Sequence, residues 1–328
     1  MEKILSIENL SVKYIVNSST AGKKKTIPAV RNVSLSINKA DSLGIIGESG
    51  CGKSTLGFSI LNLLPKEAKI ISGKIIFNNQ NILSSADESA RQLNEKELQK
   101  IRGGKIGIIF QDPLSSLNPV IKISEQIRET LKIHNQDFSD NKIEKLLEMV
   151  QLNNSKIIKN YYPHQLSGGM RQRIMIAMAI ASNPEIIIAD EPTTALDVTI
   201  QKEILELIKK LVKELSLTVI FITHNFGIIS DICNRLVVMY AGEIVEEGET
   251  SEIIKNPKHP YTKALLSAIP NVHNFRKFST IPGNVPDLLS LPDGCKFNPR
   301  CSMKTERCVK EYPQLEQKQN RLLRCFNS

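Results

Sequence analysis

No apolar run in the sequence approaches the roughly 20 residues that a helix needs to cross a bilayer. The first residues also lack the charged and apolar pattern that is typical of a signal peptide. Both absences argue against an integral membrane protein or a secreted one, so we expect the chain to remain in the cytoplasm. Hydrophobic residues make up 41% of the 328 residues and charged residues 23%, which is typical of a globular protein with a substantial core.

The balance of charge is unequal, with a formal net charge of +9 at pH 7. An excess of cations suits an anionic neighbour, which can be nucleotide phosphate, nucleic acid or a membrane surface. A solvated lysine-rich surface explains the same excess. Charge alone therefore does not identify the partner.

A glycine-rich stretch lies between an apolar, strand-like run at 43–46 and a helix-like segment at 56–64. Strand, turn and helix with Gly-x-x-x-x-Gly-Lys-Ser in the turn predict a phosphate-binding loop rather than a chance glycine-rich turn. The glycines let backbone N–H groups face an anion, Lys53 can reach the β- and γ-phosphates, and Ser54 can bind Mg²⁺. The predicted nucleotide-binding residues are Gly47, Glu48, Ser49, Gly50, Cys51, Gly52, Lys53, Ser54 and Thr55.

Three further apolar segments, each typical of a buried strand, end in polar residues: 105–110 before Gln111, 185–189 before Asp190 and Glu191, and 217–223 before His224. Ligands of open α/β sheets bind outside the carboxyl ends of the strands, so we expect these side chains to converge with the phosphate loop. Asp190 suits Mg²⁺, Glu191 suits a base that polarises water, and Gln111 can reach a metal or a water. A loop amide, a solvated turn and a structural histidine are the alternatives.

Other segments complete the predicted organisation. Strands are expected over 3–14, 33–37 and 73–77, a polar loop over 16–26, an exposed helix over 87–100, and a helical insertion over 121–160. Ser167 and two glycines precede a helix expected over 171–181, which makes a second anion-binding turn. Tyr14, at a strand end, can stack on a purine base or can simply pack.

Together these residues resemble the ATP-binding subunit of an ABC transporter over nearly the whole chain. The family's motifs stand in order: Tyr14 in the aromatic loop, the phosphate loop, Gln111 in the Q-loop, the signature, Asp190 and Glu191 at the end of the Walker B strand, the D-loop, and His224 as the switch histidine. The signature comprises Leu166, Ser167, Gly168, Gly169 and Met170, and the D-loop comprises Ala195, Leu196 and Asp197. Met170, Thr194 and Asn225 depart from the family's commonest residues without removing a group needed for hydrolysis.

The resemblance implies an α/β P-loop NTPase fold with a RecA-like core sheet, an antiparallel β-subdomain and a helical subdomain over about residues 112–165. It places an ATP-binding domain at 1–250 and a cysteine-rich C-terminal extension at 251–328. It also implies ATP and Mg²⁺ as cofactors. The magnesium ligands are then Ser54, Gln111 and Asp190, and the catalytic residues are Glu191, His224 and Gln111. Two such subunits pair head to tail, with ATP between the phosphate loop of one and the signature of the other.

Three segments, 111–119, 170–173 and 259–266, resemble more closely the branch that imports oligopeptides and dipeptides. The branch implies peptide import, although relatives carry nickel chelates or oligosaccharides. Its partners are a second, related ATPase subunit in a heterodimer, two transmembrane permease subunits and an extracytoplasmic substrate-binding protein. Such a subunit lies on the cytoplasmic face of a prokaryotic membrane.

A soluble ABC-type ATPase that acts on nucleic acid is the remote alternative. Relatives of that kind carry long coiled coils or zinc modules within the ATPase fold, or two ATPase cassettes. This chain has neither an extended heptad run nor inserted cysteine pairs. We therefore expect no nucleic-acid partner.

Four of the six cysteines crowd into the end of the chain: Cys295, Cys301, Cys308 and Cys325. A cytoplasmic setting argues against stable disulfides, whereas four thiolates can bind zinc or an iron–sulfur cluster. Structural zinc sites commonly use close cysteine pairs, which this segment lacks. The wider spacing and the similarity to peptide-importer tails favour a [4Fe-4S] cluster, with zinc and then free thiols as the alternatives.

Overall fold

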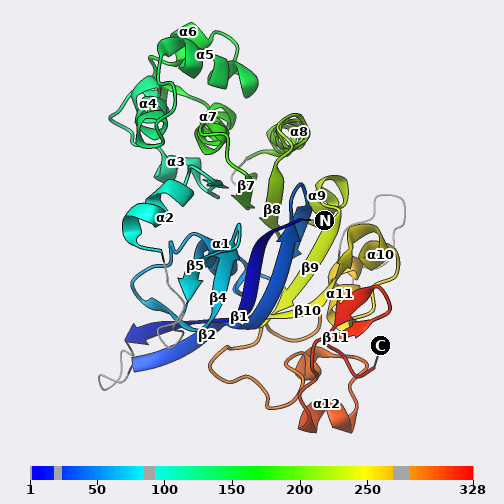
Figure 1. Cartoon of the computed structure of the whole chain (residues 1–328). Coiled ribbons are helices and arrows are strands. Elements are labelled where there is room, and N and C mark those ends of the chain that lie inside the picture. Colours follow the sequence, from blue (N-terminus) through cyan, green and yellow to red (C-terminus); the bar gives the residue numbers. More distant parts are fainter. Residues whose placement is uncertain (1, 18–23, 85–92, 195, 269–280, 328) are drawn as a thin grey trace. The chain divides into compact units, whose positions relative to one another are not determined.

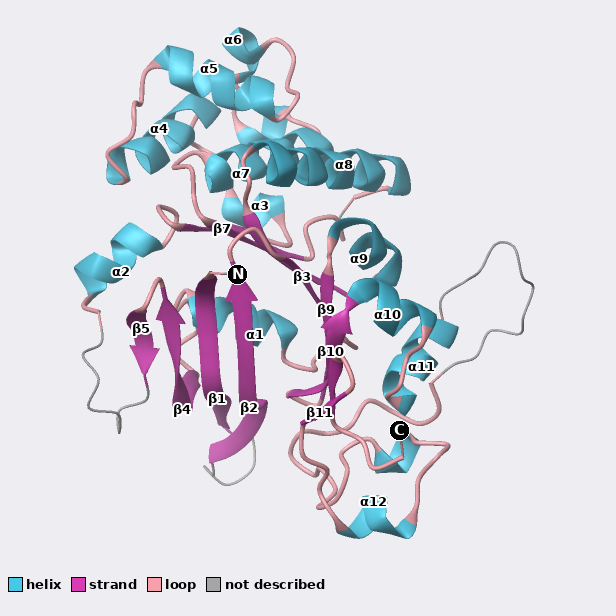
Figure 2. Ribbon diagram, turned by 45° about the vertical axis from the view of Figure 1, so that its right-hand side comes forward, coloured by secondary structure: helices cyan, strands magenta, loops and turns pink. Residues whose placement is uncertain are grey.

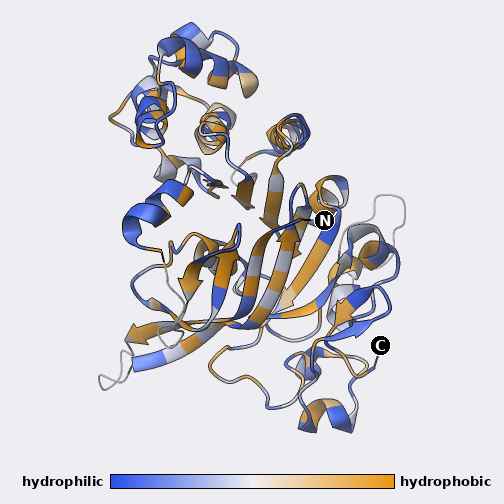
Figure 3. Cartoon of the chain, in the orientation of Figure 1, coloured by the Kyte–Doolittle hydropathy of each residue, from blue (hydrophilic) through white to orange (hydrophobic). Residues whose placement is uncertain are grey.

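A computed structural model describes residues 2–17, 24–84, 93–194, 196–268 and 281–327. The chain forms two compact units (Figure 1): Met1–Gln92 with Ile222–Ser328, and Leu93–Phe221. No helix in these described ranges is both long and apolar enough to span a bilayer. The chain is α/β, as the sequence predicted, with apolar residues concentrated on strands such as β9 (Arg235–Tyr240) (Figure 3).

The first unit contains an antiparallel sheet in the order β2-β1-β4-β5. Its strands are β1 (Lys3–Asn17), β2 (Lys24–Asn38), β4 (Ala68–Phe77) and β5 (Gln80–Ser84). The prediction of a loop over 16–26 was wrong at both ends, because Val16 pairs with Lys25 and Asn17 with Lys24. Residues 24–26 are exposed, so this end of the sheet has no apolar alternation from which a strand could be predicted. Residues 18–23 of that loop lie outside the described residues.

A second run of strands in the same unit has the order β11-β12-β10-β9-β3. It comprises β3 (Ser42–Ile46), β9, β10 (Glu243–Glu249), β11 (Glu316–Lys318) and β12 (Arg321–Leu323). Strands β3 and β9 are parallel, and their central residues are fully buried. Helices α1 (Lys53–Ile60), α9 (Phe226–Ile232), α10 (Thr250–Lys255), α11 (Pro260–Ser267) and α12 (Glu306–Lys310) complete this unit.

The end of the chain is tied to this unit through β12, which pairs with β10. Arg321 on β12 forms an ion pair of 2.9 Å with Glu246 on β10, and Glu246 is completely buried. Breaking a buried pair leaves an uncompensated charge, so the contact holds the tail firmly. A segment with little apolar material of its own is thus anchored to the sheet.

The second unit contains the parallel strands β6 (Ile106–Ile109) and β7 (Ile186–Asp190), followed in the sheet order by β8 (Thr218–Thr223). These strands and β3 confirm the four apolar runs predicted as buried strands. Helices α2 (Glu95–Ile101), α3 (Pro113–Ser116), α7 (Gly168–Ile180) and α8 (Val198–Glu214) belong to this unit. The described part of the helix expected over 87–100 begins only at Glu95, where Asn94 makes a capping box with Glu97.

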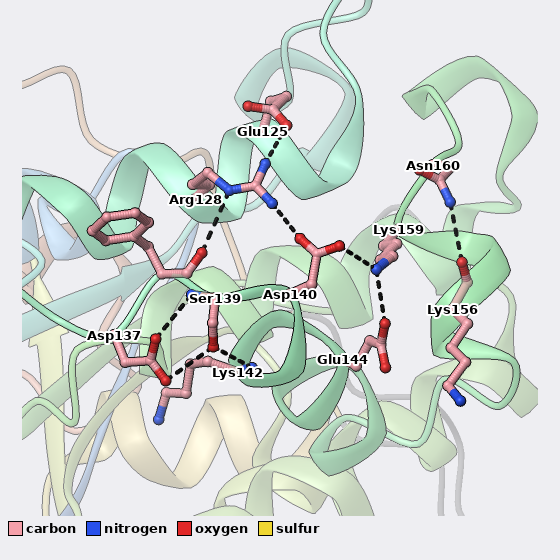
Figure 4. A network of polar contacts seen from close by, with 11 residues as sticks. Glu125, Arg128, Asp137, Ser139, Asp140, Lys142, Glu144, Lys156, Lys159 and Asn160 are labelled. Carbon is pink, nitrogen blue, oxygen red and sulfur yellow. Dashed lines mark hydrogen bonds and ion pairs between the residues drawn. The ribbon is translucent and has the colours of Figure 1, made fainter.

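The helical insertion expected over 121–160 consists of α4 (Ile123–Ile133), α5 (Asp140–Met149) and α6 (Ser155–Ile158), which lie together with α7 (Figure 2). Their apolar positions, such as Ile127 and Leu147, are fully buried. A chain of ion pairs links their polar sides (Figure 4). Arg128 pairs with Glu125 and Asp140, and Lys159 lies 2.6 Å from Asp140 and 2.7 Å from Glu144. The prediction of this insertion from its helical periodicity is therefore confirmed.

Candidate functional site

The phosphate loop, residues 47–55, leads from β3 into α1. Gly52 has a φ of 102°, and a Cβ atom there would lie 2.2 Å from the carbonyl oxygen of Ala29. A Cβ atom on Gly47 would lie 2.3 Å from the carbonyl oxygen of Met239. Neither position admits a side chain without moving backbone, which explains two of the glycines. Helix α1 begins at Lys53, so its first N–H groups close the loop.

The Lys53 side chain lies within this loop and is buried. Its Nζ atom donates to the carbonyl oxygen of Gly47 over 2.8 Å and to that of Glu48 over 3.1 Å. Both acceptors are neutral, and a phosphate oxygen forms a stronger, charge-assisted hydrogen bond with an ammonium. The loop therefore holds a cation that an anion can draw away from backbone carbonyls. Cys51 beside it is also buried, which raises the pKa of its thiol.

Tyr14 lies beside the start of α1. Its hydroxyl and that of Thr55 are 3.2 Å apart and share a hydrogen bond. The tyrosine is only partly buried. The structure thus brings the predicted aromatic residue to the phosphate loop, and its stacking on a base stays a prediction.

Glu48, the second residue of the loop, is held by residues from far along the chain. Its backbone N–H donates to the hydroxyl of Tyr261 over 2.9 Å, and Arg300 donates to both carboxylate oxygens over 2.7 and 2.9 Å. Sequence reasoning missed both partners, which lie 213 and 252 residues away. Tyr261 falls within the 259–266 segment that resembles importer tails, but nothing in that pattern indicates a contact with the loop.

A pair of carboxylates ends β7 in the second unit. Asp190 is buried, and Glu191 follows with a φ of 45°. This left-handed conformation is uncommon for a residue with a Cβ atom, and such strain clusters at functional sites. The Oε2 atom of Glu191 accepts from Gln111 Nε2 over 3.3 Å and from Thr194 Oγ1 over 2.9 Å. The structure therefore brings Gln111 to Glu191, as predicted, and adds Thr194, to which sequence reasoning gave no role.

The signature and the D-loop lie side by side in the second unit. Ser167 caps α7 by accepting a hydrogen bond from the N–H of Met170 over 3.3 Å, which explains why the helix begins before the predicted Arg171. A Cβ atom on Gly168 would lie 3.4 Å from the Leu196 side chain. Asp197 caps α8 by accepting from the N–H of Ile200 over 3.0 Å. Ala195 of the predicted D-loop lies outside the described residues.

His224 is exposed and comes directly after β8. The next residue, Asn225, caps α9 by accepting a hydrogen bond from the N–H of Gly227 over 2.9 Å. The cap fixes the turn that carries the histidine. His224 and the phosphate loop belong to the first unit, whereas Asp190, Glu191 and Gln111 belong to the second. Their convergence on a single ligand stays a prediction.

All four C-terminal cysteines line one hollow, together with His259, Pro260, Phe297, Asn298, Phe326 and Asn327. The structure thus gathers side chains that span 295–325. Within the described ranges, no group of three or more histidine, cysteine or carboxylate side chains is arranged to hold a metal ion. The predicted thiols are therefore brought together, whereas a metal bound to them stays a prediction.

Two family models match the chain. The model of the ABC transporter family covers residues 30–194, and the model of the oligopeptide/dipeptide transporter C-terminal region covers residues 245–308. The first match contains the phosphate loop, Gln111, the signature, Asp190 and Glu191. The second contains Tyr261, Arg300 and three of the four clustered cysteines.

Known proteins are similar along most of the chain. The dipeptide transport ATP-binding protein DppD of Bacillus subtilis is 42% identical over 95% of this chain and 91% of its own length. The oligopeptide transport ATP-binding protein OppD of Haemophilus influenzae is 41% identical over 94% of this chain and 92% of its own length. A solved dimeric ATP-binding cassette, in a post-hydrolysis state with ADP and phosphate, is 30% identical over 75% of this chain and 99% of its own, with a TM-score of 0.61.

Proposed function

The chain belongs to the ABC transporter family of ATP-binding, ATP-hydrolysing subunits, and from that premise we propose that it powers the import of dipeptides or oligopeptides. The observation that carries the peptide cargo is the match of residues 245–308 to the oligopeptide/dipeptide transporter C-terminal region. The relatives described above have names that refer to peptide transport and are similar to this chain over nearly their whole length, which supports the same cargo.

ATP binding begins at the phosphate loop. Lys53 exchanges its two carbonyl acceptors, those of Gly47 and Glu48, for oxygens of the β- and γ-phosphates. The N–H groups at the start of α1, the positive end of the helix dipole, also attract the phosphates. Ser54, Asp190 and Gln111 are the residues that would hold Mg²⁺, which neutralises phosphate charge when bound. The oxygen donors of these three side chains suit that ion.

Hydrolysis depends on Glu191 as the group that polarises the attacking water. Gln111 and Thr194 both donate to its Oε2 atom, and these two hydrogen bonds fix the orientation of the carboxylate that would act as the base. His224 would contact the γ-phosphate. Because that contact exists only before hydrolysis, the γ-phosphate favours the closed pair of ATPase subunits.

A neighbouring ATPase subunit completes the site with its own Ser167-Gly168-Gly169 equivalent, and this chain's signature serves the neighbour's ATP. The capped start of α7 presents N–H groups for that purpose. The partner is a related but different chain. The helical segment at about 112–165 contacts the two permease subunits at the cytoplasmic face of the membrane, and a substrate-binding protein delivers the peptide from outside.

The four cysteines that line the hollow bind a [4Fe-4S] cluster. Structural zinc sites, the alternative, commonly use close cysteine pairs, and these four cysteines are spaced more widely along the chain. Four thiolates are the ligands that would hold such a cluster. The four cysteine side chains line one hollow and supply that set of ligands. If bound, a cluster would link parts of the tail that are distant in the sequence, and ATP hydrolysis would not require it.

Transport by the complete assembly tests the peptide cargo. The chain is co-expressed with its neighbouring ATPase and permease subunits, reconstituted in liposomes, and supplied with the binding protein loaded with a dipeptide or a hexapeptide. We expect ATP-dependent peptide uptake and faster ATP hydrolysis with the loaded binding protein. Uptake of a nickel chelate or an oligosaccharide, with no response to peptides, would contradict the peptide cargo and leave the assignment as an ATPase intact.

A further inference from the structure

Glu48 places a carboxylate inside the loop that is expected to bind phosphates. Phosphate binding by the loop needs its glycines, its lysine and its serine, so the acidic side chain of Glu48 has no evident use there. A negative charge close to a bound triphosphate weakens binding unless a cation compensates it. The structure supplies that cation from the C-terminal region.

Arg300 meets Glu48 in a fork-to-fork geometry. Its Nη1 and Nη2 atoms lie 2.7 and 2.9 Å from the two carboxylate oxygens. The side chains are 5% and 20% exposed, so water screens the pair only weakly. Bidentate pairs of this kind fix orientation as well as charge. The pairing raises the pKa of the arginine further above its ordinary value, so it carries a positive charge at any physiological pH.

The guanidinium is itself held in place. Its Nε atom donates to the carbonyl oxygen of Pro282 over 2.9 Å, and its Cζ atom lies 5.9 Å from the centre of the Tyr240 ring. Arg300 therefore cannot follow Glu48 if the loop moves without breaking contacts with its own segment. The loop is thus bonded to a side chain that is also held by Pro282 and Tyr240.

A second connection runs through aromatic rings. Tyr261, whose hydroxyl accepts from the Glu48 N–H, packs against Tyr240 with ring centres 4.6 Å apart and against Phe297 with centres 5.3 Å apart. Phe297 also lines the four-cysteine hollow. Backbone and side chain of Glu48 are thus both held by residues that pack with the C-terminal region.

We propose that Arg300 is a positioning residue of the ATP site. Its guanidinium neutralises the Glu48 carboxylate and turns it away from the phosphates. Through this contact the C-terminal region sets the affinity for ATP. The proposal rests on the proposed function in one respect, that residues 47–55 bind ATP. It assigns to the tail a role in the ATPase cycle that is separate from cargo and from any metal.

Substitution of Arg300 tests this role. In Arg300→Ala the released carboxylate repels the phosphates, and we expect the Kd and the KM for ATP to rise on the order of tenfold, the effect of losing one charged hydrogen-bonded pair. The value of kcat at saturating ATP stays within about twofold, because Glu191 and its partners are untouched. Arg307→Ala is the matched control, since Arg307 lies on α12 of the same tail, is exposed and pairs with Glu311.

Rescue separates an electrostatic role from a structural one. Adding Glu48→Gln to Arg300→Ala removes the unpaired charge and should return the Kd for ATP to within about threefold of wild type. Arg300→Lys keeps the positive charge but not the two-pronged hydrogen bonding, and its Kd should be intermediate. A loss of structure would instead lower the active fraction, and so kcat, with KM unchanged.

Two results would overturn the proposal: a folded Arg300→Ala protein with the wild-type Kd for ATP, or a double variant that binds ATP no better than Arg300→Ala. If Arg300→Ala does not fold, Glu48→Gln and the double variant are compared, and a difference above about threefold in their Kd values contradicts the role. Failure of the wild-type protein to bind ATP would reject the proposed function, while ATP binding without peptide transport would leave this test unaffected.

Discussion

The amide nitrogen of Gln111 lies 3.3 Å from the Oε2 oxygen of Glu191, and the Thr194 hydroxyl lies 2.9 Å from the same atom. Two donors converge on one oxygen of the carboxylate, and the left-handed backbone of Glu191 is what presents it to them. Strain at such a position is maintained only where the surroundings enforce it. This arrangement is the basis of the first two predictions.

Replacing Glu191 by Gln removes the base and keeps the shape of the side chain. We expect ATP binding to be retained and kcat to fall by roughly 10²- to 10⁴-fold, the usual contribution of a general base. Calorimetry measures the binding, and phosphate release measures turnover. Glu203→Gln, which alters an exposed glutamate on α8 that pairs with Arg173, is the control and should turn over normally. Full turnover in Glu191→Gln would remove this residue from the mechanism.

Thr194→Val removes one of the two donors on Glu191 without changing the size of the side chain. The carboxylate then loses a hydrogen bond to a charged acceptor, which is typically about 1.5–3 kcal/mol. We expect kcat to fall on the order of tenfold with KM for ATP unchanged, because the phosphate loop is unaltered. Thr194→Ser keeps the hydroxyl and should behave as wild type. Equal rates for the valine and serine variants would show that the hydroxyl does not orient the base.

Lys53→Ala takes the only ammonium out of the phosphate loop. The phosphate charge then lacks the cation that Lys53 supplies, and we expect nucleotide affinity to fall on the order of a hundredfold. Titration calorimetry with ATP gives the Kd directly. Lys39→Ala, at an exposed position before β3, is the matched control. An unchanged Kd for Lys53→Ala would contradict the assignment of the loop.

The cysteine-lined hollow predicts a visible chromophore. Protein purified without oxygen should be brown and absorb at roughly 400 nm, where thiolate-ligated iron absorbs. Cys308→Ser should lose the colour and the iron, whereas Cys233→Ser should keep both, since Cys233 is buried away from the hollow's lining residues. Iron and zinc are counted by atomic emission. Colourless wild-type protein with stoichiometric zinc would replace the cluster by a zinc site.

Sequence patterns predicted the buried strands best. Runs such as 217–223 are almost wholly β-branched or apolar, and a fully buried strand requires that composition. The ends of β1 and β2 escaped prediction because Lys24 and Lys25 are exposed on a ribbon without a buried face. Helix starts were displaced for a different reason. Ser167 caps α7 ahead of its first charged residue, and the capping side chain decides where the helix begins.

The sequence predicts a role for a residue where one motif carries its own chemistry. Lys53 and Glu191 stand in local motifs of this kind, and their roles stay predictions. Arg300 and Glu48 do not, because a contact between residues 252 positions apart leaves no local trace in a single sequence. Thr194 was visible only as a departure from the family's usual serine, and its hydroxyl contact with Glu191 required the folded chain.

The central claim is that residues far apart in the sequence bind one ATP that is shared with a neighbouring subunit. Cryo-electron microscopy of Glu191→Gln, assembled with its partner ATPase and permeases and saturated with Mg²⁺ and ATP, tests it directly. We predict density for ATP against Lys53, with Gln111, Asp190 and His224 around its γ-phosphate and the partner's signature on the opposite side. A nucleotide bound elsewhere, or a γ-phosphate out of reach of Asp190 and His224, would contradict the account.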